Sequence, residues 1–334
     1  MYVRRNLRWS IILKFAWKNI LIFFIWAALI VFLEIYLGDN NLSLAIPFLP
    51  LSTIGIAVAF YLGFKNNAAY DRFWEARKIW GMIVNYSRSW GMHAVTFLHK
   101  QALPEEVLSD QRKALIYRHI AWLNALRLML RKPNSFSIQH KGATKTFYKG
   151  SAEKKHWDEE VGVFLDKEEY GYIIGKKNPA THLIRLQGND IQQLVDNNQI
   201  TNFNHFQFNK VLEEFYNLQG KCERIKNTPY PRQYAYFSKV FVWIFAILMP
   251  FGLVGEFEKV GGMMIFLTIP FSVLISWIFT TMEIVGDSSE DPFENFINDV
   301  PMTALCRTIE IDLREMLEEV NVPPKVMPEM DVLM

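Results

Sequence analysis

The stretch LSLAIPFLPLSTIGIAVAFYLGF, residues 42–64, decides the class of fold to which this chain belongs. It contains no charged residue, and its length matches the roughly 20 apolar residues that a helix needs to cross a hydrocarbon layer about 30 Å thick. Residues 20–37, which carry only Glu34, and the uncharged residues 240–255 and 260–281 are comparable. The sequence therefore predicts an all-α membrane protein with four transmembrane helices.

The four predicted helices form two hairpins, because residues 38–41 and 256–259 are short connections. Both termini and the long middle region should therefore lie on one side of the membrane. Lys and Arg gather on that side, and such residues near span ends favour the cytoplasmic face. They are Arg4, Arg5, Arg8, Lys14, Lys18, Lys65, Arg72, Arg77, Lys78, Arg224, Lys226, Arg232 and Lys239.

Composition and motifs exclude several classes of function. Among 334 residues, 51% are hydrophobic and 21% charged, and the net charge of only +2 argues against a nucleic-acid partner. The seven histidines show no pairing at metal-ligand spacing, and no Gly-x-Ser-x-Gly motif occurs, so no enzymatic reaction is expected. Cys222 and Cys306 fall in stretches placed in the cytoplasm and should be free.

Ile56, Phe60 and Phe64 in the second predicted helix are spaced i, i+4 and i+8, so they lie along one side of it. Apolar stripes of this kind commonly face lipid or neighbouring helices. Arranged as rings around a pore, the same residues would form a dry constriction that gates by dewetting. The residues alone leave both interpretations open.

Several local stretches carry a resemblance to a known family. Residues 62–81, LGFKNNAAYDRFWEARKIWG, resemble the signature of the bestrophin ion channels in its bacterial form. CERI at residues 222–225 and TPYP at 228–231 precede the third span, and DPFE at 291–294 and CRTIE at 306–310 follow the fourth. The resemblance covers nearly the whole chain apart from the middle insertion and the last residues.

The resemblance implies a homopentameric channel in a bacterial inner (plasma) membrane, with the second span of each subunit lining the pore. It implies an apolar neck at Ile56, Phe60 and Phe64 and a cytosolic aperture at Tyr230. Family members often carry an aliphatic residue at the aperture, so Tyr230 departs from the pattern. The expected partners are other copies of the chain, the lipid bilayer and permeant inorganic ions.

These expectations divide the chain into five parts. They are a cytosolic N-terminal segment (1–19), a first transmembrane hairpin with the pore-lining helix (20–64), a cytosolic helical domain (65–239) with an exposed insertion near 132–159, a second hairpin (240–281) and a cytosolic C-terminal segment (282–334).

The nature of the permeant ion stays open at this level. Animal bestrophins resemble anion channels and bacterial relatives include candidates for cation conduction, so chloride or a similar anion is favoured only slightly over sodium or potassium. Aromatic edges favour anions and aromatic faces favour cations, and the sequence does not fix ring orientation. A third interpretation is a membrane scaffold or sensor that does not conduct.

Three further features have competing interpretations. The acidic residues Asp287, Glu290, Asp291, Glu294 and Asp299 form either a calcium site, as in the animal family, or a solvated loop that pairs with the basic N-terminus. Glu34 is a candidate intramembrane carboxylate, but its place near the span end favours reaching the membrane interface. Pro47 and Pro50 mark a broken helix or, as we favour, a helix start.

Overall fold

The computed structural model describes residues 1–334 except 39, 41, 99–103 and 133–156. The described part is helical, with only isolated β-bridges at Tyr2–Val332 and Glu329–Val332, and this confirms the all-α prediction. Its helices are α1 (Trp9–Gly38), α2 (Phe48–Thr96), α3 (Glu105–Arg131), α4 (Trp157–Glu160), η3 (Gly162–Phe164), α5 (Lys167–Ile174), α6 (Pro179–Asp196), α7 (Asn202–Asn227), α8 (Arg232–Val260), η4 (Gly262–Leu267), α9 (Thr268–Ser288) and α10 (Met302–Met316).

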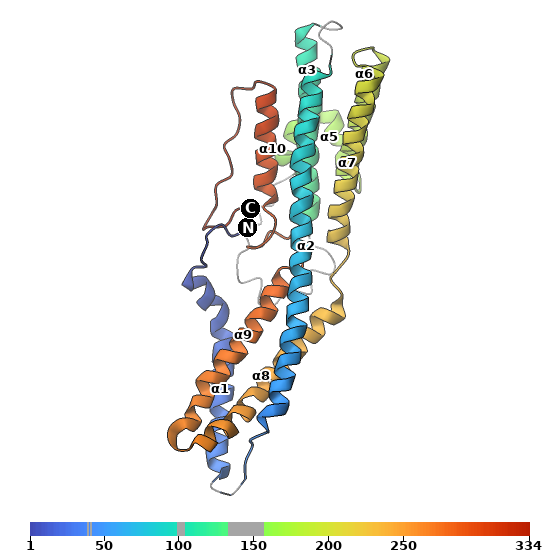
Figure 1. The fold of residues 1–334 in the computed structure, drawn as a ribbon. Helices are drawn as coiled ribbons and strands as arrows, with labels where there is room; N and C mark the ends of the chain where they lie inside the picture. Colours follow the sequence, from blue (N-terminus) through green and yellow to red (C-terminus); the bar gives the residue numbers. More distant parts are fainter. Residues whose placement is uncertain (39, 41, 99–103, 133–156) are drawn as a thin grey trace.

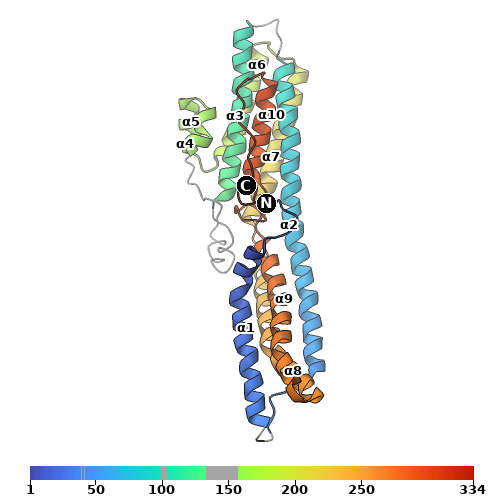
Figure 2. The ribbon, with the colours of Figure 1, turned by 90° about the vertical axis from the view of Figure 1, so that its left-hand side faces the viewer.

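The molecule is elongated and consists of two helical bundles that follow each other along its length (Figures 1 and 2). The membrane bundle contains α1, α8, α9 and the first part of α2. The distal bundle contains the rest of α2 with α3, α6, α7 and α10. Helix α2 runs without a break through both bundles, so the predicted division between residues 64 and 65 falls inside one continuous helix.

Four helices in the described part are long and apolar enough to cross a membrane: Ala16–Gly38, Phe48–Thr96, Arg232–Val260 and Gly262–Ser288. They correspond to the four predicted spans. Two boundaries were wrong. Helix α2 begins at Phe48, and residues 42–47 are not helical. The predicted connection at residues 256–259 is the last turn of α8, which continues to Val260. Pro47 occupies the N-cap and Pro50 the first turn, where a missing N–H is tolerated, so the helix-start interpretation is confirmed.

Each bundle has its own apolar core. In the membrane bundle, Leu51, Val58 and Leu62 of α2 pack against Val242 and Phe245 of α8. Helices α2 and α8 approach so closely that a Cβ on Gly55 would lie 2.7 Å from a carbon of the Phe245 ring. A larger core in the distal bundle is built on the buried rings of Trp80, Trp90, Trp122, Phe208 and Phe215.

The two chain termini lie side by side between the bundles (Figure 1). The backbone N–H of Val3 donates to the carbonyl of Asp331 at 2.9 Å, and Arg8 pairs with the Asp331 carboxylate at 2.8 Å. The basic N-terminus thus pairs with the C-terminal segment. Cys222 and Cys306 are free, as predicted, and both are buried. The predicted insertion from Lys132 to Glu159 lies almost entirely outside the described residues.

Candidate functional site

The predicted neck residues form an exposed apolar stripe on α2. Ile56, Phe60 and Phe64 are 71%, 69% and 61% exposed, although α2 is otherwise packed against α8 and α9. The Phe60 and Phe64 rings are in contact edge to face, with centroids 4.7 Å apart and an interplanar angle of 90°. Large apolar side chains grouped on one face mark a contact with lipid, a pore or another subunit.

Tyr230, the predicted aperture residue, has different surroundings. It lies in the short link between α7 and α8 and is only 8% exposed in the subunit. Burial raises the pKa of its hydroxyl above the ordinary value of 10.0, with smaller contributions from Glu290 and the neighbouring Tyr61. Its ring packs within the subunit, and an aperture at this position stays a prediction.

Directly behind the stripe, α2 carries a buried ammonium group. The Lys65 side chain is fully buried, and its Nζ donates to Glu283 Oε1 at 3.2 Å. Asp287 and Glu290 each place a carboxylate oxygen 3.8 Å from the same Nζ. We call these four residues the Lys65 cluster. Burying a charge is costly unless it is paired, so the cluster fixes the rotation of α2 against α9.

The next residue strengthens this connection between α2 and α9. Asn66 Nδ2 donates to the Met282 carbonyl at 3.1 Å. A Cβ on Gly286 would lie 2.0 Å from Asn66 Oδ1, so a larger residue at this crossing would displace the Asn66 side chain. The segment that follows Phe64 is therefore held rigidly to the end of the fourth span.

The other residues of the predicted acidic run also face groups of the same chain. Asp291 lies 3.8 Å from Arg72, Glu294 accepts from Lys226 at 2.8 Å, and Asp299 accepts from the backbone N–H of Phe296 at 3.0 Å. Asp291 and Glu294 therefore pair with α2 and α7 and not with the basic N-terminus. Asp299, in contrast, interacts electrostatically with the N-terminal ammonium group of Met1, in line with the proposed pairing.

No group of three or more His, Cys, Asp or Glu side chains is arranged to hold a metal ion in the described ranges. Calcium binding stays an untested prediction from the family resemblance. A calcium ion at this loop would compete with the basic partners that the carboxylates already have.

Two carboxyl groups of this region have raised pKa values. Burial raises the pKa of Glu290 to about 7, with repulsion from Asp287 opposing the attraction to Lys65. Burial likewise raises the pKa of Asp299 to about 7. Both groups therefore change their average charge near neutral pH.

Glu34 is buried within the subunit at the end of α1, and its position at the membrane interface stays a prediction. Its side chain is 1% exposed and accepts hydrogen bonds from Ser43 Oγ at 2.5 Å and from the backbone N–H of Leu44 at 2.7 Å. The carboxylate thus ties the end of α1 to the link that leads into α2. This explains why a charge is retained inside an otherwise apolar span.

Sequence reasoning missed the Lys65 cluster, although a signal was present. Leu62, Lys65 and Ala69 are spaced i, i+3 and i+7 and all are essentially unexposed, so they share the inward face of α2. A lysine on that buried face needs an anionic or hydrogen-bonding partner, because an unpaired buried charge is costly. The identity of the partners depends on the packing of α9, which the spacing does not give.

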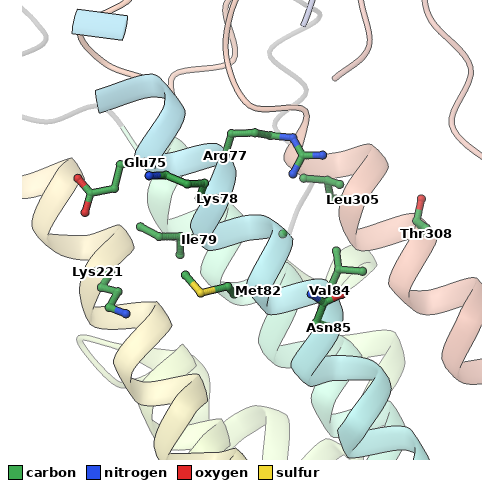
Figure 3. Close-up of a pocket in the computed structure, with 11 residues that line it drawn as sticks. Glu75, Arg77, Lys78, Ile79, Met82, Val84, Asn85, Lys221, Leu305 and Thr308 are labelled. Atoms are coloured by element: carbon green, nitrogen blue, oxygen red, sulfur yellow. The ribbon is translucent and has the colours of Figure 1, made fainter. Parts of the chain in front are cut away.

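A hollow of about 720 Å³ lies among α2, α7 and α10 in the distal bundle. Figure 3 shows Arg77 extending towards α10 and Lys78 extending towards Glu75, so these cations do not converge on one point. Glu75 is in turn paired with Arg224 at 2.5 Å. The exposed stripe of α2 therefore remains the candidate site.

Comparison with known proteins agrees with this architecture. Residues 3–315 match the family described as Bacterial/Fungal Bestrophin protein. The voltage-dependent anion channel-forming protein YneE of Escherichia coli (strain K12) is 30% identical over 98% of this chain and 95% of its own length. A similarly named protein of Mesorhizobium japonicum is 28% identical over 88% of this chain and 81% of its own length. A crystal structure of a bacterial bestrophin homologue from Klebsiella pneumoniae has a TM-score of 0.73 and 26% identity, covering 91% of this chain and 99% of that one.

Proposed function

Because the chain belongs to the bacterial and fungal bestrophin family, we propose that it assembles as a homopentamer and conducts ions passively across the bacterial inner membrane. In this proposal the membrane bundle spans the bilayer, and the distal bundle and both termini lie in the cytoplasm. The five-part division of the chain is retained, except that α2 joins its second and third parts.

The observation that carries the proposal is the exposed stripe of α2. A helix of 49 residues is about 73 Å long at about 1.5 Å per residue, so one face of it extends through both bundles. Copies of α2 around an axis would convert Ile56, Phe60 and Phe64 into apolar rings. Such rings make a narrow constriction that excludes water when closed.

We favour anions as the permeant species. The support is the name of the relatives, which are called voltage-dependent anion channel-forming proteins and match 78–98% of this chain. Phe60 and Phe64 meet edge to face, so one ring of the pair can present its positive edge to the pore. Cation conduction by the same architecture is the alternative outcome of the test.

The test is ion flux through purified protein in liposomes. One preparation has a chloride gradient with an impermeant cation, and the other has a sodium gradient with an impermeant anion. Flux in the first preparation alone is expected. Flux in the second alone assigns the chain to cation conduction, and flux in neither, from a sample whose mass equals five subunits, refutes the channel and favours a scaffold.

A further inference from the structure

The exposed stripe of α2 continues beyond the apolar neck and becomes polar. Successive residues of a helix are rotated by about 100°, which places Phe64 about 40° and Asp71 about 20° from Phe60 around the axis. Asp71 therefore lies within the arc that the neck residues occupy, about 10 Å further along the helix than Phe64. Both Asn67 and Asp71 are exposed, as the neck residues are.

Asp71 is the first charged group that this face presents after the neck. Lys65 lies between them in sequence, but its ammonium group is buried against Glu283 on the opposite side of α2. Arg72 is also turned away, because its Nε donates to the Glu290 carbonyl at 2.8 Å and its Nη2 to the Ile225 carbonyl at 2.7 Å. The side chains of Lys65 and Arg72 thus point away from the stripe, and the Asp71 carboxylate stays on it.

The Asp71 carboxylate is not neutralised within the subunit. It has no ion-pair or hydrogen-bond partner in the part of the chain that the structure describes. The next charge on the same arc is the exposed Lys78, about 10 Å beyond Asp71. Lys78 is thus about 20 Å from Phe64, twice as far as Asp71, and with a Debye length of about 8 Å at physiological ionic strength its field at the neck is screened much more strongly than the field of Asp71.

We propose that the Asp71 carboxylates form a ring below the neck that raises the permeability of cations relative to anions. The proposal rests on the pentameric channel proposed above and adds a residue that sets its ion discrimination. Rings of Asp or Glu concentrate cations and deplete anions beside a constriction. Asp71 acts in this way whether the channel as a whole prefers anions or cations, because it shifts the ratio of the two permeabilities.

The experiment measures reversal potentials in planar bilayers for the wild type and for Asp71→Asn, Asp71→Lys and Asp71→Glu. Potentials of one to several kT change local ion concentrations about threefold or more. Asp71→Asn should therefore lower the cation-to-anion permeability ratio at least about threefold, and Asp71→Lys should lower it further. Asp71→Glu keeps the charge and should keep the ratio.

Two controls separate an electrostatic role from a structural one. Asp110 is an exposed carboxylate on α3, away from the stripe, and Asp110→Asn should leave the ratio unchanged. The wild-type ratio should also fall between 0.1 M and 1 M salt, because the Debye length falls from about 10 Å to about 3 Å. This second measurement needs no variant and holds even where a substitution impairs assembly.

An unchanged ratio in a conducting Asp71→Asn protein, or a wild-type ratio independent of salt, overturns the inference and leaves the channel intact. Absence of conductance in the wild type refutes the proposed function instead.

Discussion

Replacing Lys65 with methionine should destabilise the protein strongly. Met has nearly the length of Lys and no charge, so Lys65→Met leaves Glu283 and Glu290, which are 8% and 2% exposed, without their cation. Removing one partner from a buried charge pair typically costs about 3–5 kcal/mol. At about 2 °C per kcal/mol for a large chain, the unfolding midpoint should fall by about 6–10 °C.

Thermal unfolding of the detergent-solubilised protein at pH 8 measures this change. Lys78→Met is the matched control, because Lys78 is an exposed lysine of the same helix, and its midpoint should stay within about 1 °C. The loss in Lys65→Met should be smaller at pH 5.5, where the Glu290 carboxyl with its pKa of about 7 is largely protonated. Equal midpoints for Lys65→Met and Lys78→Met would refute the structural role of the cluster.

Three further changes test other parts of the account. The folded-state pKa of Glu290 is about 7 and its ordinary value is 4.5, so the folded state binds the proton more tightly than the unfolded state. The free energy of unfolding should therefore fall as the pH rises from about 5 to 7.5 and level off above that pH. Glu290→Gln should reduce this pH dependence in thermal scans. Phe60→Ala should widen the neck and raise single-channel conductance without changing the mass of the assembly, and unchanged conductance would place the neck elsewhere. Glu34→Gln should lower the free energy of unfolding by about 1–3 kcal/mol, because it weakens the hydrogen bonds with Ser43 and Leu44. A thermal unfolding midpoint equal to that of the wild type would show that these hydrogen bonds do not stabilise the fold.

Hydropathy was enough to predict the membrane bundle, because each predicted span is an apolar run with at most one charged residue and a length close to that which a bilayer requires. The start of α2 was misplaced at Leu42, since residues 42–47 are as apolar as the helix that follows. Apolar character indicates that a segment lies in the membrane, but it does not show whether the backbone of that segment is helical. Pro47 and Pro50 were the better guide to the first turn.

The site was only partly predictable, for a different reason. The stripe of Ile56, Phe60 and Phe64 follows from helical periodicity within one segment. The partners of Lys65 and the burial of Tyr230 depend on how α7, α8 and α9 rotate against α2, and local spacing carries no information on these rotations. The function of Glu34 likewise depends on a backbone N–H of the following link.

Thiol modification of Phe64→Cys tests most directly whether the α2 stripe lines the conduction pathway. The native Cys222 and Cys306 are 0% and 3% exposed, so a bulky hydrophilic thiol reagent should react only with the introduced cysteine. The proposed pore predicts that current through the reconstituted variant falls irreversibly on modification, while wild-type current is unaffected. Complete modification, verified by mass, with undiminished current would contradict it.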